Sequence, residues 1–208
     1  MNRKHLGRQS VRFDFPPSIL SYASVVGKKE GEGPLAAYFD QISTDTHFGQ
    51  TTWEKAESQM QALALQEALK KASLSPSSVH MLFAGDLLNQ CIGTSFAARG
   101  TDIPFYGLYG ACSTMAESLS LAAMAVEGGY AELAAAMTSS HFASAERQYR
   151  LPLEYGGQRT PTAQWTVTGS GSALVCSEGK GPRLTCGTVG TVRDLGIKDA
   201  GNMGAAMA

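Results

Sequence analysis

The sequence lacks any close pair of cysteines. Its four cysteines, Cys91, Cys112, Cys176 and Cys186, lie far apart along the chain, and no Cys-x-x-Cys occurs. The four histidines do not stand at ligand spacing from them either. Zinc sites and disulfide frameworks need closely spaced cysteines, so the sequence argues against both and indicates a reducing compartment. We interpret Cys91, Cys176 and Cys186 as structural residues.

Charge is also scarce and is not concentrated anywhere. Charged residues make up 17% of the 208 residues, the formal net charge is −1, and no basic stripe is present. Nucleic-acid-binding surfaces depend on clustered Lys and Arg, so a nucleic-acid partner is not expected. Hydrophobic residues make up 43% of the chain, which is enough for the core of one large domain or two small ones.

Long apolar runs are missing as well. No run is long enough to cross a membrane, and Arg3 and Lys4 are not followed by the apolar segment of a signal peptide. We therefore expect neither a transmembrane segment nor a signal peptide in this sequence.

One predicted helix organises the rest of the chain. Residues 105–129 predict a short apolar strand, a tight turn and then a helix over Ser113–Glu127. Nearly every face of that helix carries Ala, Leu, Met, Ser or Val, and only Glu117 and Glu127 are charged. A helix that is apolar all round is normally buried all round. We therefore expect it to pack between a sheet and a further layer.

Cys112 stands at the start of this helix. The first turn of a helix has amide donors without partners and a partial positive charge, which favour a thiolate. Cys112 is therefore a candidate nucleophile or a wall of a ligand pocket. The alternative is a buried structural thiol, which is the usual role of a cysteine.

Strands and helices alternate along the chain. The predicted strands are Ser18–Val26, Val79–Ala84, Pro104–Tyr109, Leu133–Met137, Trp165–Ser177 and Leu184–Val192. The other predicted helices are Leu35–Ile42, a long helix that ends at about Ala72, and Ile92–Arg99. We expect irregular structure in residues 1–17, a loop at Gly27–Pro34 and a long surface excursion at Phe142–Gln164.

The long helix begins with a capping box. Thr51 is its predicted N-cap, and Glu54 follows at the third helical position. An apolar face includes Met60, and we expect Glu57 and Gln61 to be solvated.

This alternation predicts an α/β domain with a largely parallel sheet. In such sheets ligands bind beyond the carboxyl ends of the strands. Three polar segments fall at predicted strand ends: Asp86–Gln90, Cys112–Thr114 and Ser139–His141. Their convergence indicates a candidate site. For Asp86, a helix cap and a ligand contact remain equal alternatives. For His141, a general base is one alternative, but a lone histidine is more often a packed or surface residue.

Six segments of the sequence resemble the stage V sporulation protein AD family. They are Phe83–Gln90, Gly110–Thr114, Thr138–His141, Ala145–Gln148, Glu154–Gly157 and Thr166–Gly171. The resemblance implies one half of a thiolase-like αβαβα layered fold, a mixed, mostly parallel sheet with helices on both faces. The family belongs to spore-forming Firmicutes and is tied to uptake and release of dipicolinic acid across the spore inner membrane. It is regarded as a group of binding proteins rather than working condensing enzymes.

The resemblance also implies a set of ligand-binding residues. Cys112 falls where thiolases and ketoacyl synthases place their acyl-accepting cysteine, and the likeness extends to Asp86 and Ser113. With Thr114 beside them, and His141 added by its strand-end position, these five form the candidate site. No catalytic residue and no cofactor are implied. The expected ligand is dipicolinic acid or its calcium chelate, with Asp86 contacting the calcium and the helix start contacting the organic edge.

Partners and domain organisation follow from the same resemblance. A thiolase-like chain repeats its unit twice, and no internal repeat is visible here. Residues 1–208 are therefore expected to be an N-terminal thiolase-like domain, truncated before its second half. One face of the central helix should then be exposed and favour a homodimer. Expected partners are the other stage V sporulation channel proteins, with peripheral attachment at the cytoplasmic face or periphery of the spore inner membrane.

The rival hypothesis is an acyltransferase of the thiolase or ketoacyl synthase type. Cys112 would accept the acyl group, and backbone amides would form an oxyanion hole. The His or Asn residues that activate such a cysteine come from the second half of a thiolase-like protein.

Overall fold

A computed structural model of the chain describes residues 4–149 and 166–198. Their main feature is a six-stranded sheet in which only one strand runs against the others. Across the sheet the strands are β4 (Gln41–Ile42), β3 (Ser18–Val26), β8 (Gly169–Cys176), β7 (Leu133–Ser140), β5 (Met81–Gly85) and β6 (Phe105–Leu108). The antiparallel strand is β8, so the sheet is mixed but mostly parallel.

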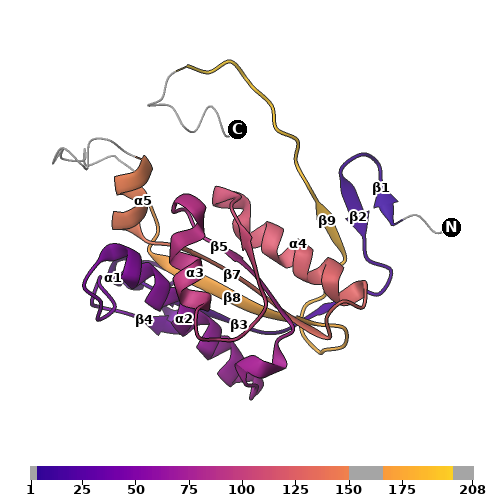
Figure 1. Cartoon of the computed structure of the whole chain (residues 1–208), viewed down its shortest axis with the longest axis horizontal. Helices are drawn as coiled ribbons and strands as arrows, with labels where there is room; N and C mark the ends of the chain where they lie inside the picture. The colour runs from indigo at the N-terminus through magenta and orange to yellow at the C-terminus, as the bar shows by residue number, and fades with distance from the viewer. Residues whose placement is uncertain (1–3, 150–165, 199–208) are drawn as a thin grey trace.

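Helices cover both faces of this sheet (Figure 1). On one face lie α2 (Trp53–Ala72) and α3 (Ile92–Ala98), and on the other lies α4 (Thr114–Glu127). Alternate strand residues serve the two faces, as the period of a strand requires. In β7, Ala135 and Met137 pack in the cluster that includes Leu65 of α2, whereas Ala134 and Ala136 pack with α4. The predicted α/β architecture is confirmed.

The long helix α2 begins one residue later than predicted. Its N-cap is Thr52, whose hydroxyl accepts a hydrogen bond from the Lys55 amide at 3.3 Å, so the expectation of Thr51 was wrong. The expectation that Glu57 and Gln61 are solvated was also wrong, because both are fully buried. They lie where α3 and the helix at Phe142–Tyr149, α5, pack on α2. The pattern of α2 alone does not show which distant elements cover this part of the helix.

The central helix α4 follows a 3₁₀ turn at Ala111–Ser113. Its inner side, which includes Ala122 and Val126, is buried against the sheet. Its outer side is partly exposed at residues such as Leu121 and Met124. This arrangement agrees with the prediction that one face of the central helix is not covered by a further layer.

The N-terminal region is more regular than expected. Residues predicted to be irregular include β1 (His5–Leu6) and β2 (Ser10–Arg12). They pair with β9 (Cys186–Thr188) in a separate three-stranded antiparallel sheet. The strand predicted at Leu184–Val192 is therefore short, and residues 189–198 leave the body of the protein as an extended segment (Figure 1).

Two further predictions need correction. The Gly27–Pro34 loop contains a short helix, α1 (Lys28–Gly31). The helix predicted at Leu35–Ile42 is a 3₁₀ turn at Ala36–Tyr38 followed by β4. Both segments are too short for local sequence patterns to separate turn, helix and strand.

The predicted surface excursion after β7 opens with a helix, α5 (Phe142–Tyr149). Residues 150–164 of that excursion, and Trp165 at the start of the next predicted strand, lie outside the described residues. In the part of the chain that the structure describes, no helix combines the length and the hydropathy needed to span a membrane.

Candidate functional site

Three polar segments meet at one edge of the sheet. Strands β6, β5 and β7 are parallel neighbours, so their carboxyl ends point the same way. Asp86 directly follows β5, the 3₁₀ turn Ala111–Ser113 follows β6, and His141 directly follows β7. The convergence predicted from the strand ends is therefore present.

Gly85 lets two of these segments approach each other. A Cβ atom at this position would lie 1.9 Å from the Leu108 carbonyl oxygen of β6 and 2.8 Å from Thr114 Cγ2. No side chain fits between them, so the end of β6 and the first turn of α4 pack directly on β5. Thr114 is fully buried at this contact and supports the Cys112 turn from beneath.

Asp86 acts as a cap for α3. Its side chain is 1% exposed. Oδ1 accepts a hydrogen bond from the Leu88 amide at 2.7 Å, and Oδ2 accepts from the amide and the hydroxyl of Thr94 at 2.6 and 2.5 Å. A direct contact with calcium would have to compete with these bonds to the first turn of α3.

Cys112 and Ser113 are the candidate residues at the surface. Cys112 is an exposed free thiol. The residue before it, Ala111, has a φ of 48°, in the left-handed region that non-glycine residues rarely adopt. The Ser113 hydroxyl donates to the Gly110 carbonyl at 2.7 Å, which tightens the turn. This strained turn holds the thiol out toward solvent at the start of α4.

A groove of about 590 Å³ begins beside this turn. One wall is the outer face of α4, and the other is residues 188–192, at the end of β9 and directly after it. Gly110, Ser113 and Glu117 line one part of it, and Leu121 and Met124 line another. Glu117 is the acidic side chain in this groove, which therefore combines a carboxylate and a hydroxyl with an apolar floor.

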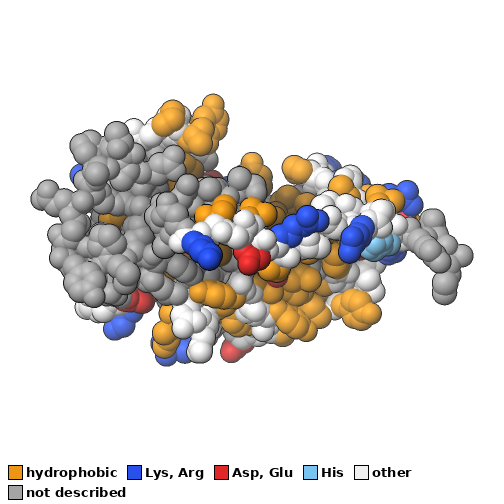
Figure 2. Space-filling model, turned by 90° about the horizontal axis from the view of Figure 1, so that it is seen from above, with side chains coloured by type: hydrophobic (Ala, Val, Ile, Leu, Met, Phe, Trp, Pro, Cys, Tyr) orange, Lys and Arg blue, Asp and Glu red, His pale blue; other side chains and the backbone are white. Residues whose placement is uncertain are grey.

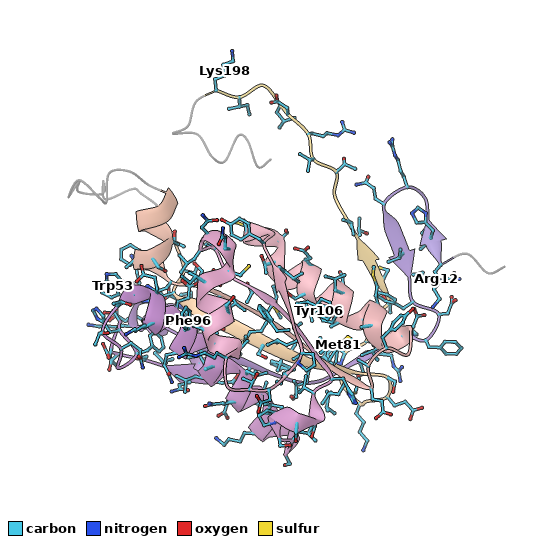
Figure 3. All side chains as sticks on the ribbon, in the orientation of Figure 1. Arg12, Trp53, Met81, Phe96, Tyr106 and Lys198 are labelled. Atoms are coloured by element: carbon cyan, nitrogen blue, oxygen red, sulfur yellow. The ribbon has the colours of Figure 1, made fainter. Side chains whose placement is uncertain are left out.

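The hydrogen-bond partners of the His141 ring lie at Thr46 and at the start of α5, not in the Cys112 turn. His141 is 1% exposed, and its Nε2–H donates to the Thr46 carbonyl at 2.8 Å while Nδ1 accepts from the Ala143 amide at 3.2 Å. This pattern assigns a neutral ring, and burial lowers the pKa of His141. The ring of Trp53, labelled at the start of α2 in Figure 3, lies 5.4 Å from the His141 ring. His141 therefore anchors the start of α5.

The sequence analysis missed a second buried carboxylate, Glu57. Its Oε1 accepts from the Ser139 hydroxyl and its Oε2 from the Ser144 hydroxyl, both at 2.7 Å. The Gln61 amide nitrogen donates to Ser139 Oγ at 2.5 Å and to Thr94 Oγ1 at 2.9 Å. Burial raises the pKa of Glu57 to about 7, and the nearby negative charge of Asp86 adds to the rise.

A signal for this cluster was present in the sequence. The buried residues of α2 fall in adjacent pairs four residues apart: Ala56 and Glu57, Met60 and Gln61, Ala64 and Leu65, Ala68 and Leu69. Glu57 and Gln61 therefore belong to the same face as the apolar residues. A polar residue inside an apolar stripe indicates a buried hydrogen-bond network rather than a solvated face.

The buried cluster connects two of the candidate residues. Hydrogen bonds run from Asp86 through Thr94, Gln61 and Ser139 to Glu57, and Ser144 continues to the His141 carbonyl at 3.1 Å. Of the five sequence-predicted site residues, Asp86 and His141 thus belong to the buried cluster, and Thr114 packs on Gly85. Within residues 4–149 and 166–198, no group of three or more His, Cys, Asp and Glu side chains is arranged to hold a metal ion.

Comparison with known families gives a match over nearly the whole chain. Residues 7–208 match the family described as Stage V sporulation protein AD. The chain is 44% identical over 205 residues to the Stage V sporulation protein AD of Bacillus subtilis (strain 168). That alignment covers 99% of this chain and 61% of the relative, so the chain spans about three fifths of the relative's length.

Comparison with solved structures identifies the fold. The priming β-ketosynthase of the R1128 polyketide pathway superposes with a TM-score of 0.50 and 19% identity, over 83% of this chain and 52% of that one. The 3-oxoacyl-[acyl-carrier-protein] synthase III of Aquifex aeolicus VF5 superposes with a TM-score of 0.51 and 16% identity, over 77% and 53% of the two chains. At these identities the likeness shows the fold alone, and this fold is the predicted thiolase-like α/β fold.

Proposed function

The chain belongs to the stage V sporulation protein AD family, and from this premise we propose that it binds dipicolinic acid or its calcium chelate. It would do so as a non-catalytic, thiolase-like protein that serves uptake and release of this compound across the spore inner membrane. The observation that carries the proposal is the groove that opens at Ser113, beside the exposed Cys112 turn. We further propose peripheral association with other stage V sporulation channel proteins, which rests on family membership.

The organic edge of the ligand meets the start of α4 in this proposal. Dipicolinate is planar and carries two negative charges near neutral pH. The first turn of a helix presents amide donors and a partial positive charge, which suit a carboxylate. Cys112 and Ser113 border this turn at the surface. A neutral Cys112 thiol is the better neighbour here, because a thiolate would repel the dianion.

The metal edge of the calcium chelate is assigned to Glu117. A carboxylate that faces free dipicolinate would repel it, whereas the one-to-one calcium chelate is neutral and keeps metal positions open. Calcium takes oxygen ligands, including carboxylates. Glu117 lines the groove together with Ser113, whereas the oxygens of Asp86 bind the start of α3. In this arrangement Thr114 supports the Cys112 turn beside the groove, whereas Asp86 caps α3 and His141 anchors α5.

Calorimetry on the full-length protein tests this assignment. We expect Glu117→Gln to weaken binding of the calcium chelate by about tenfold or more, because a charged metal contact is lost. Binding of the free acid should stay equal or tighten, because a repulsion is removed. Glu132→Gln, at an exposed acidic residue beyond the end of α4, is the matched control and should change neither. Equal weakening of both ligands by Glu117→Gln would contradict the metal-edge role. A selective loss in Asp86→Asn instead would move the metal edge to Asp86.

The second candidate function is acyl transfer, and the exposure of Cys112 at a helix start favours it. Among the described residues, however, no side chain hydrogen-bonds the Cys112 thiol. A thiol nucleophile needs an adjacent base or cation for rapid acylation. We therefore expect a mass-shift assay with short acyl-CoA thioesters to leave Cys112 unmodified.

Cys186, a second exposed thiol, provides an internal control in the same assay. A general thiol reagent should label both cysteines and thereby show that Cys112 is accessible. Rapid, stoichiometric acylation of Cys112 by the thioester, with Cys186 unmodified, would favour the acyltransferase hypothesis over the binding-protein hypothesis.

A further inference from the structure

Glu57 joins three elements of the fold through two hydroxyl groups. It projects from α2 and accepts hydrogen bonds from Ser139 at the end of β7 and from Ser144 in α5. All three side chains are buried, with Glu57 at 0% and Ser144 at 1% exposure. The contact with Ser144 therefore connects α5 to α2 through a single carboxylate oxygen.

The surroundings of Glu57 give an ionised carboxylate little compensation. Within the described residues no Lys or Arg pairs with it, and its hydrogen-bond partners are the two serine hydroxyls. Among the described residues, the charge that acts on Glu57 is that of Asp86, which is a like charge. Burying a charge without a partner costs far more free energy than burying a neutral group.

Among the side chains that the structure describes, the other elements around Glu57 supply no cation either. Ile92–Ala98 of α3, Leu133–Ser140 of β7 and Phe142–Ala145 of α5 carry no ionisable side chain, and the side chains of residues 146–149 of α5 lie outside the described ones. The ionisable side chains of β3 and β8 are Tyr22, which is exposed, and Cys176, which packs in the cluster around Leu69. His141, which follows β7, is neutral. The charged groups that act on it are His47 and Glu30, and neither is among the groups that act on Glu57.

The two hydroxyls accommodate a proton on Glu57 without any movement of heavy atoms. Ser139 Oγ already accepts from Gln61, so its hydrogen points to Oε1. Ser144 Oγ lies within hydrogen-bond distance of both Oε2, at 2.7 Å, and the His141 carbonyl, at 3.1 Å. With a proton on Oε2, Glu57 donates to Ser144 Oγ, and Ser144 donates to the His141 carbonyl. Rotation of a single hydroxyl therefore serves both protonation states.

Asp86 differs from Glu57 in this respect. Two of its three donors are main-chain amides, of Leu88 and Thr94, whose direction cannot be reversed. Asp86 is thus held as an acceptor, whereas Glu57 can act as donor or acceptor.

We propose that Glu57, with Ser139 and Ser144, forms a buried proton-binding site that fastens α5 to α2 when it is protonated and releases α5 when it is ionised. Undocking of α5 removes Ser144 from above Glu57 and lets water reach the carboxylate. Such local opening needs less free energy than unfolding of the whole domain, and it responds to pH in proportion to the difference in proton affinity between the docked and open states. The inference concerns α5 alone and does not depend on the ligand proposed above.

Amide hydrogen exchange in the full-length protein tests the proposal. After correction for intrinsic exchange, protection of the α5 amides from Ala145 to Tyr149 should fall by on the order of 100-fold between pH 5 and pH 8. In Glu57→Gln the protection should stay flat over this range. The side chain of glutamine reproduces the protonated arrangement, because its amide can donate to Ser144 and its oxygen can accept from Ser139.

Two further variants separate proton binding from a merely structural role. Glu67→Gln removes a carboxylate that pairs with Lys70 on the outer side of α2, and it should keep the wild-type pH dependence. Ser144→Ala should move the midpoint of the transition to higher pH, because the Ser144 hydrogen bond lowers the pKa of Glu57. Wild-type protection that does not change with pH, or a Glu57→Gln variant that retains the wild-type dependence, would overturn the proposal.

Discussion

The Glu57→Gln variant is expected to be more stable than the wild type at pH 8, by up to about 3 kcal/mol, and nearly equal to it below pH 4.5. In the folded protein the pKa of Glu57 is raised from 4.5 to about 7, so the folded state binds more protons than the unfolded state between these values. The free energy of unfolding contributed by Glu57 is therefore fully present below pH 4.5 and is lost as the pH rises through 7. If α5 opens locally, Glu57 is hydrated in the folded protein as well, and the loss of unfolding free energy at high pH is smaller than this maximum.

Urea unfolding at pH 5 and pH 8 measures this effect. The difference between the wild type and Glu57→Gln should grow with pH, whereas Glu67→Gln should follow the wild type. Other carboxylates act in a lower range with the opposite sign: the Lys71 and Ser24 hydrogen bonds outweigh burial and lower the pKa of Asp40, so its contribution is lost as the pH falls. A stability difference of the same size at both pH values would contradict the role assigned to Glu57.

Gly85→Ala is expected to destabilise the protein by about 2–4 kcal/mol or to prevent folding. The new Cβ would lie 1.9 Å from the Leu108 carbonyl oxygen, which is a main-chain atom that cannot rotate away. The end of β6 would have to move away from β5, and the Cys112 turn and Thr114 would move with it. We therefore also expect weaker ligand binding at the groove in any folded fraction.

Gly171→Ala is the matched control for this variant. Gly171 lies in β8 of the same sheet, and a Cβ atom there meets nothing within 4 Å. Gly171→Ala should lower the free energy of unfolding by less than about 1 kcal/mol, because alanine has a higher β-propensity than glycine and no contact is violated. Thermal unfolding followed by circular dichroism compares the two. A Gly85→Ala variant as stable as Gly171→Ala would show that β5 and β6 are not held as closely as described.

Local patterns in the sequence were enough to predict the architecture. The alternating, β-rich segment Ser18–Val26 coincides with β3, and the helix predicted over Ser113–Glu127 coincides with α4 to within one residue. The ends of three predicted strands indicated the edge of the sheet where Asp86, Cys112 and His141 lie. Parallel strands place their carboxyl ends together, so strand order along the chain carries spatial information. Short segments such as Gln41–Ile42 were not predictable, because two residues contain no period.

The chemical roles of individual side chains depended on partners that are distant in the sequence. Asp86 allowed a cap and a ligand contact as equal alternatives, and its bonds to Leu88 and Thr94 place it as a cap of α3. Glu57 was predicted to be solvated, although its position in the apolar stripe of α2 indicates burial. Only the fold shows that its hydrogen-bond partners are Ser139 and Ser144, more than 80 residues away. The sequence by itself determined the family, the alternation of strands and helices and the edge of the sheet that carries the polar residues. Tertiary structure alone decided which groups surround Glu57, because they come from distant elements, and these surroundings in turn set its proton affinity.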